Sequence, residues 1–209
     1  MSVETLFLFL DFGGIALFAF SGGMLAARKE LDPFGAAILG AVTGMGGGTL
    51  RDVLLGTLPV YWVEAPVYLW VALGGALAGY YSSGWAQSVA NRRVVLVWAD
   101  AVGMSAFCVI GAQAGLEAGA HWTIALLTGV MSAAFGGLIR DIIVNDVPLL
   151  LKEDVYALAA LAGAAAYVAA LALGIGPSFA AVGGALIAFV LRGCAIQFKW
   201  SLPPIGKVG

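Results

Sequence analysis

Seven stretches of mostly apolar residues follow one another along the chain, and at about 20 residues each is long enough to cross a bilayer as a helix. They lie at roughly 5–27, 34–57, 65–83, 94–115, 122–145, 155–174 and 177–197. Only 11% of the residues are charged, whereas a soluble domain carries about 25%. The chain therefore has too little charge to cover a water-facing surface. We expect an all-α membrane protein whose single domain, residues 1–209, contains seven transmembrane helices.

A pattern of glycines and charged residues occurs twice in the chain, at a constant offset of 89 positions. The most informative identities are Asp11/Asp100, Arg51/Arg140, Asp52/Asp141 and Pro59/Pro148. They define repeat 1 as residues 4–83 and repeat 2 as residues 93–174, with an extra helix at 177–197 outside the repeat. Each copy has three spans. Because three is an odd number, the copies enter the membrane in opposite directions, and we expect an inverted 3+3 repeat.

Glycines are concentrated in the middle of the second and fifth stretches. The second contains Gly44-Met45-Gly46-Gly47-Gly48-Thr49-Leu50-Arg51-Asp52, and the fifth contains Phe135-Gly136-Gly137-Leu138-Ile139-Arg140-Asp141. Small residues spaced by four favour close helix packing. Adjacent glycines also weaken a helix, by about 1 kcal/mol each relative to alanine. We expect helices two and five to be kinked or broken at these glycines, with the freed backbone facing protein or a water-filled cavity.

Six charged residues lie inside the expected spans of the two repeats: Asp11, Arg51, Asp52, Asp100, Arg140 and Asp141. A charge near the bilayer centre costs about 2.5–3.5 kcal/mol, so such a residue has a partner and often a functional role. Depth along the spans matches Asp11 with Arg51 near one face, and Asp100 with Arg140 near the other. These pairs either join helices structurally or line a pore. Four acids against two bases leave an excess of two negative charges, which favours cations in an aqueous path.

The expected pore and gate residues are those of the two glycine-rich segments, with the two remaining aspartates as buried charge partners. They are Gly44, Gly46, Gly47, Gly48, Thr49, Arg51, Asp52, Gly136, Gly137, Arg140 and Asp141, partnered by Asp11 and Asp100. Hydroxyls of Thr43, Thr49 and Ser132 would replace part of the hydration of an ion. Each arginine is a candidate gate, because a cation must pass its fixed positive charge.

Basic residues outside these clusters all fall on one side of the expected topology: Arg28, Lys29, Arg92, Arg93, Lys152, Arg192, Lys199 and Lys207. The positive-inside rule then places the N-terminus outside and the C-terminus in the cytoplasm, as for a multi-pass protein of the plasma (inner) membrane. Anionic lipid would be attracted to Arg92, Arg93 or Lys152.

Other functional classes find little support in the sequence. It has no nucleophile–base set and no metal-ligand spacing, so we expect no enzyme activity, no catalytic residue, no metal and no cofactor. It has no basic run that would bind nucleic acid. Cys108 and Cys194 are far apart in apolar segments and are expected to be packed thiols. His121, beside Trp122, is expected to contact lipid headgroups.

The segment Gly46–Gly56 resembles the first conserved motif of the prokaryotic trimeric intracellular cation (TRIC) channel family, together with Pro59, Trp62, Pro66 and Tyr68. The segment Gly136–Asp141 with Pro148 resembles the second. The resemblance implies a homotrimer in which each subunit has its own pore for monovalent cations, chiefly potassium. It also implies that the second and fifth helices line that pore. Phe135 and Asn145 stand where glycine is usual in the family.

Bacterial members of the same family are also labelled as glycine or small-solute transporters. The alternative function is therefore a secondary transporter for a small amino acid such as glycine, because inverted repeats and broken helices serve transporters as well as channels. A membrane scaffold packed through its small residues is a third interpretation. It leaves the buried charges with no purpose beyond assembly.

Overall fold

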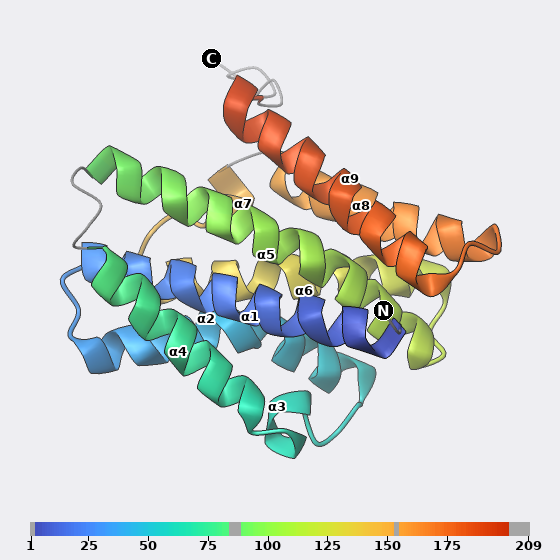
Figure 1. The fold of residues 1–209 in the computed structure, drawn as a ribbon, viewed down its shortest axis with the longest axis horizontal. Coiled ribbons are helices and arrows are strands. Elements are labelled where there is room, and N and C mark those ends of the chain that lie inside the picture. The colour runs from blue at the N-terminus through green and yellow to red at the C-terminus, as the bar shows by residue number, and fades with distance from the viewer. Residues whose placement is uncertain (1–2, 84–88, 153–154, 201–209) are drawn as a thin grey trace, which may run out of the picture.

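The computed structural model describes residues 3–83, 89–152 and 155–200, and all regular secondary structure in these ranges is helical (Figure 1). Its helices are α1 (Val3–Arg28), α2 (Pro33–Leu55), α3 (Tyr61–Glu64), α4 (Val67–Ser82), α5 (Val89–Glu117), α6 (Trp122–Ile143), α7 (Leu149–Lys152), α8 (Tyr156–Ala172) and α9 (Pro177–Phe198). The seven long helices occupy the seven expected stretches, and two four-residue helices, α3 and α7, were not expected. Lys207 and the side chains of Arg92 and Lys152 lie outside the described part of the chain.

Within the described ranges, four of these helices are both long and apolar enough to cross a membrane: α1, α5 from Arg93, α6 and α9. The helix α2 carries the Arg51–Asp52 pair near its end, and α4 and α8 have only 16 and 17 residues. Large apolar side chains are widely exposed, among them Phe9 (75%), Trp70 (69%) and Phe179 (80%). An exposed apolar surface of this extent is expected where a protein faces lipid.

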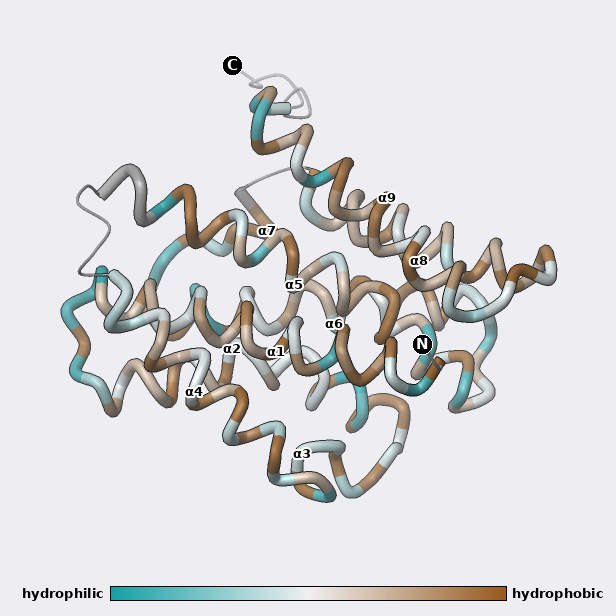
Figure 2. The backbone as a smooth tube through the Cα atoms, viewed as in Figure 1, coloured by the Kyte–Doolittle hydropathy of each residue, from teal (hydrophilic) through white to brown (hydrophobic). Residues whose placement is uncertain are grey.

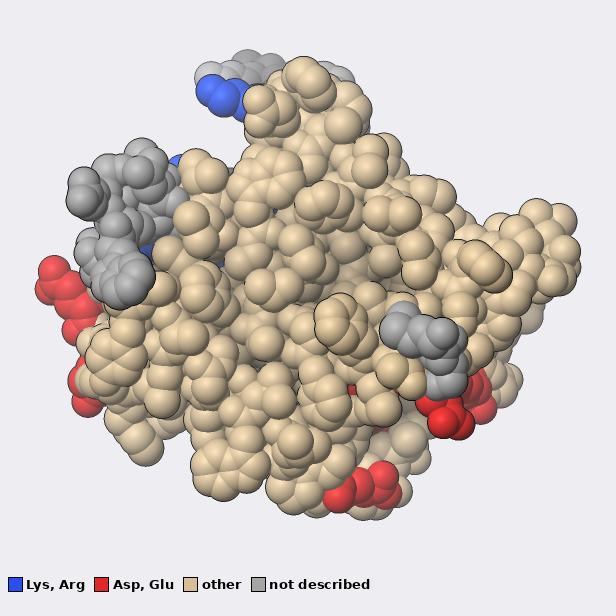
Figure 3. Space-filling view, viewed as in Figure 1, with Lys and Arg blue, Asp and Glu red and all other residues tan. Residues whose placement is uncertain are grey.

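Polar residues gather mainly in the loops and at the ends of the helices (Figure 2). On the face drawn in Figure 3 the charged side chains lie at the margins, around a broad uncharged middle. The local sequence explains several of these ends. Asp32 caps α2 by accepting a hydrogen bond from the backbone N–H of Gly35 at 2.7 Å, and Pro33 occupies the first turn. Gly56 ends the same helix in the left-handed conformation, with φ of 72°.

The helices α2 and α6 pack against each other, and both run without interruption through their glycines. The expectation of a break there is wrong, whereas the expectation of a kink stays a prediction. A Cβ atom on Gly47 would overlap the carbonyl oxygen of Ser132, and one on Gly136 would overlap that of Thr43. Glycine is therefore required because the two backbones touch, whereas an unwound turn would leave carbonyl groups without partners in lipid.

Contacts between the two halves are reciprocal. Gly14 lies against the ring of Phe107 and Gly103 lies against that of Phe18, while the two rings stack with centroids 5.4 Å apart. Each contact recurs between the counterparts 89 positions away: Gly14 with Phe107 matches Gly103 with Phe18, and in the same way Gly47 with Ser132 matches Gly136 with Thr43. Reciprocal contacts of this kind arise when two equivalent units pack about a two-fold axis.

Candidate functional site

The first charged cluster lies at the end of α2. Arg51 binds the neighbouring Asp52 twice, from Nε at 2.8 Å and from Nη2 at 2.6 Å, both to Oδ1. The other carboxylate oxygen of Asp52 accepts a hydrogen bond from the backbone N–H of Tyr61 at 3.1 Å, which fixes the start of α3. The Tyr61 ring lies 5.8 Å from the guanidinium carbon of Arg51. Both charged side chains are almost completely buried.

The second cluster, at the end of α6, repeats this arrangement. Arg140 Nε donates to Asp141 Oδ1 at 2.8 Å, and Asp141 Oδ2 accepts from the backbone N–H of Leu149 at 2.9 Å, at the start of α7. Arg140 Nη1 adds contacts to Asp100 at 2.9 Å and to Ser21 at 2.8 Å. In each repeat, then, the aspartate that follows the arginine holds both that arginine and the next short helix.

The chain turns in the same way after both clusters. The backbone N–H of Thr57 donates to the backbone carbonyl of Asp52 at 2.9 Å. The backbone N–H of Asp146, 89 positions later, donates to the backbone carbonyl of Asp141 at 2.8 Å. The residues just before these donors, Gly56 and Asn145, both have positive φ. Asparagine tolerates this conformation better than most residues. Asn145 therefore keeps the turn that Gly56 makes in the first repeat.

The partner expected for Arg140 is confirmed, but the one expected for Arg51 is wrong. Asp100 and Arg140 form an ion pair in which both side chains are about 1% exposed. Among the described residues no ion pair joins Asp11 to Arg51, whose Nε and Nη2 are both held by Asp52. The half-buried Asp11 faces the hydroxyl of Tyr68 instead. Matching depth along the helices correctly predicted one pair, but it could not predict how the guanidinium would turn.

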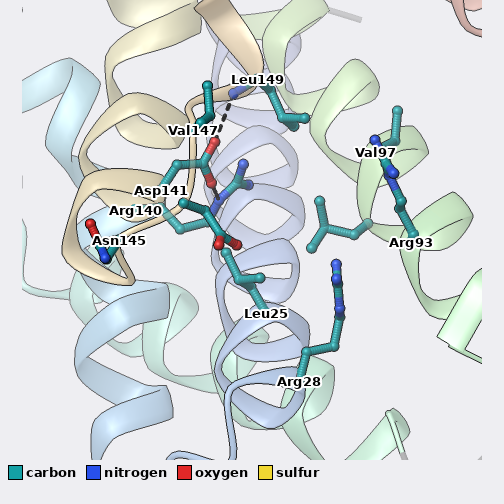
Figure 4. A pocket seen from close by; sticks show the side chains of 11 residues that line it. Leu25, Arg28, Arg93, Val97, Arg140, Asp141, Asn145, Val147 and Leu149 are labelled. Carbon is teal, nitrogen blue, oxygen red and sulfur yellow. Dashed lines mark hydrogen bonds and ion pairs between the residues drawn. The ribbon is translucent and has the colours of Figure 1, made fainter. Parts of the chain in front are cut away.

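Each cluster lies at one side of a cavity. The Arg140 cavity has a volume of about 360 Å³ and is lined by Arg28, Arg93, Arg140, Asp141 and Asp146, among others. Arg28 and Arg93 extend from α1 and α5 toward the same space, with Arg140 and Asp141 across from them (Figure 4). Lys29 at the end of α1 binds Asp146 at 2.6 Å. Arginines therefore dominate the charge of this cavity.

The Arg51 cavity has a volume of about 320 Å³, and its lining includes Arg51, Asp52, Tyr61, Glu64 and Glu117. Carboxylates outnumber the arginine here, so the two cavities have opposite charge. They share no lining residue. The crossing of α2 and α6 separates them, because Arg51 and Arg140 each follow the crossing glycine of their own helix by four residues.

Polar side chains also lie at the crossing itself. Thr43 and Ser132 are buried, and the Ser132 hydroxyl has no hydrogen-bond partner among the described residues. Thr49 donates to the carbonyl of Met45 at 2.8 Å and accepts from the Trp62 indole at 3.0 Å. Of the other expected glycines, Gly44 packs against the Ile15 backbone, Gly46 faces Ile139, Gly48 faces Tyr61 and Gly137 faces Asp100. The structure thus brings Gly46, Gly47 and Gly136 together at the α2–α6 contact, whereas Gly44, Gly48 and Gly137 face α1, α3 and α5.

Sequence reasoning missed one residue of this charged core, Arg192. It was grouped with the basic residues of the helix ends, but its side chain is buried (1% exposed) and its guanidinium carbon lies 4.9 Å from the centroid of the Tyr156 ring. Its position inside the expected span 177–197 was the available signal. The charges of the helical core are therefore four acids and three bases among the described residues, so the excess is one negative charge rather than two.

Comparisons with known proteins agree on one group of relatives. A family model described as "Glycine transporter" matches residues 8–83 and 97–172, at the same offset as the sequence repeat. A UPF0126 membrane protein of Vibrio cholerae is 36% identical over 97% of this chain and 84% of its own length. The UPF0126 inner membrane protein YadS of Escherichia coli is 34% identical over 93% of both chains. The TRIC channel orthologue of Rhodobacter sphaeroides, a solved structure, is 42% identical, with a TM-score of 0.89 over 94% of this chain and 100% of that one.

Proposed function

We propose, from the premise that this chain belongs to the TRIC cation channel family, that it is a membrane channel through which monovalent cations pass. The observation that carries the proposal is the pair of cavities that reach buried Arg–Asp clusters on the two sides of the α2–α6 crossing. A path that joins them runs along Thr43, Gly47, Ser132 and Gly136. The buried Ser132 hydroxyl has no hydrogen-bond partner among the described residues, and ordered water or a partly dehydrated ion would satisfy it.

The proposed topology has seven transmembrane helices and an inverted repeat. Support comes from the reciprocal contacts, which pair Thr43 with Gly136 and Gly47 with Ser132. Thr43 precedes Gly47 in α2, whereas their partners Gly136 and Ser132 occur in the reverse order in α6. These equivalent helices therefore run in opposite directions. The N-terminus is placed outside and the C-terminus in the cytoplasm, which puts Arg28 and Arg93 of the Arg140 cavity on the cytoplasmic side.

The two arginines are the proposed restrictions of the path, and the carboxylates attract cations to it. Each arginine lies between its cavity and the crossing and is held by the following aspartate. A guanidinium that swings away on release would widen the path. The proposal also includes a preference for potassium, a homotrimer with a pore in each subunit and contacts with membrane lipids. The solved relative, described as a trimeric intracellular cation channel, supports the trimer.

A current measurement tests the function directly. We expect the purified protein, reconstituted in a planar bilayer, to produce unitary currents under a potassium chloride gradient. Their reversal potential should lie near the potassium equilibrium potential, because the carboxylates of the path exclude chloride. Adding sodium chloride to one side gives the preference between the cations. A reversal potential near that of chloride would contradict the proposal.

The competing function is a secondary transporter for a small amino acid, and the family description favours it. Cavities that open on two sides of a closed centre also fit alternating access. Glycine uptake into proteoliposomes separates the two functions. Saturable uptake coupled to an ion gradient, without unitary currents, would favour the transporter, whereas currents without glycine uptake would favour the channel.

Neutralising Arg51 tests its proposed role as a restriction. We expect Arg51→Gln to raise the unitary potassium conductance about threefold, which is the Boltzmann factor for one unit charge acting over roughly 7 Å in water. Lys199→Gln is the matched control, since it removes an exposed positive charge at the end of α9 that lines neither cavity. If both variants conduct like the wild type, Arg51 does not restrict the path.

A further inference from the structure

The two repeats differ in charge at equivalent places. In repeat 1, Asp11 and Asp52 are opposed by Arg51 alone. In repeat 2, Asp100 and Asp141 are opposed by Arg140 and also by Arg192, which lies close enough to act on the same group of side chains. Arg192 belongs to α9, the helix outside the repeat, so no residue of repeat 1 corresponds to it. Among the described residues, the core charges of the first half therefore include one uncompensated carboxylate, whereas those of the second half are balanced.

Arg192 is connected to the second cluster through Tyr156. Its guanidinium carbon lies 4.9 Å from the centre of the Tyr156 ring, and both side chains are buried. The Tyr156 hydroxyl donates to the backbone carbonyl of Ala133 at 3.1 Å and lies beside the carboxylate of Asp100. Packing of Gly193 against Trp98 holds this part of α9 beside α5, two residues before Asp100. The position of the Arg192 charge is thus fixed by three helices, α5, α8 and α9.

We propose that Arg192 is a specificity-determining residue of the conduction path. Its side chain packs on Tyr156, and its charge balances those of Asp100 and Asp141. Net negative charge is therefore confined to the half of the path that contains Arg51. This inference rests on the proposed function. The charges of the two cavities agree with this difference, since the Arg51 cavity is acidic and the Arg140 cavity is lined by three arginines. A path that is negative at one end only passes cations more readily from that end, because the local cation concentration is higher there.

Single-channel currents in symmetric potassium chloride test this asymmetry, whichever way the protein inserts. At about 50 mM salt, where fixed charges act over more than 10 Å, we expect the wild type to rectify. Arg192→Met leaves one uncompensated carboxylate in the second half as well. It should raise the smaller of the two currents about threefold, the Boltzmann factor for a unit charge at roughly 7 Å in water, and so reduce rectification. In about 1 M salt the difference should disappear, because screening shortens the range to about 3 Å.

Three further variants separate this effect from a structural role. Arg192→Lys keeps the charge and should retain wild-type rectification. Arg192→Gln neutralises it but keeps hydrogen-bonding capacity, and it replaces Arg192→Met if that variant does not fold. Lys199→Gln removes an exposed charge from the end of the same helix and should rectify like the wild type.

Each outcome decides the matter. Loss of rectification in both neutral variants, with rescue by lysine, supports the assignment. Lower thermal stability with unchanged rectification means that Arg192 only supports the fold, and the inference fails. Equal loss in Lys199→Gln also overturns it, since surface charge alone would then explain the asymmetry. Absence of wild-type currents refutes the proposed channel itself and is distinguishable from all of these results.

Discussion

Replacing Gly136 by alanine is expected to destabilise the protein by about 3 kcal/mol, the upper part of the range for an overpacked core. The added Cβ would overlap the carbonyl oxygen of Thr43, which belongs to the backbone of α2. No change of rotamer relieves this overlap, so α2 and α6 must move apart along their whole contact. Thermal denaturation of the detergent-solubilised protein would show the loss as a lower melting temperature.

Gly74→Ala is the matched control for this experiment. Gly74 lies in α4, and a Cβ atom there would meet nothing within 4 Å. Alanine is the better helix former by about 1 kcal/mol, so the control should be neutral or slightly stabilising. An equal loss in both variants would contradict the close approach of α2 and α6 as the reason why glycine is needed at position 136.

Asp100→Asn is expected to cost about 3 kcal/mol, the lower end of the range for removing one partner of a buried ion pair. The substitution leaves the Arg140 guanidinium in a site where both partners are about 1% exposed. Arg140 keeps its contacts with Asp141 and Ser21, which is why the loss should not reach the upper end. Chemical denaturation in detergent, followed by tryptophan fluorescence, measures the free energy of unfolding.

Asp11→Asn is the control that the repeat provides, since Asp11 occupies the position equivalent to Asp100. It is only half-buried, and its neighbour is the Tyr68 hydroxyl rather than an arginine. Asparagine can replace that contact, so the loss should stay below about 1 kcal/mol, the value of one ordinary hydrogen bond. Similar losses at positions 11 and 100 would contradict the difference between the halves that the structure describes.

Apolar length and the offset of 89 positions predicted the long helices and the correspondence between the two charged clusters. The prediction succeeded because a chain in lipid must form its backbone hydrogen bonds within each segment, so apolar length alone gives helices. The short helices α3 and α7 escaped prediction, because carboxylate oxygens of Asp52 and Asp141 bind their first turns across a loop.

The glycines show where local propensity misleads. Gly46, Gly47 and Gly48 weaken a helix in isolation, and from that we expected a break. In the structure α2 stays helical there, and its glycines allow the close contact with α6 while the hydrogen-bonded backbone continues. Close packing, which the spacing by four predicted for Gly48, accounts for Gly46 and Gly47 as well, since both contact α6.

The sequence by itself determined that the chain is helical, apolar at its surface and built from two related halves, and it identified Asp100 as the partner of Arg140. The tertiary structure alone decided that Arg51 binds Asp52 rather than Asp11, and that Arg192 lies in the charged core. Helix formation depends on residues near one another in the chain. The pairing of a long flexible guanidinium depends on the direction in which neighbouring helices present their carboxylates, and only the packed fold fixes that direction.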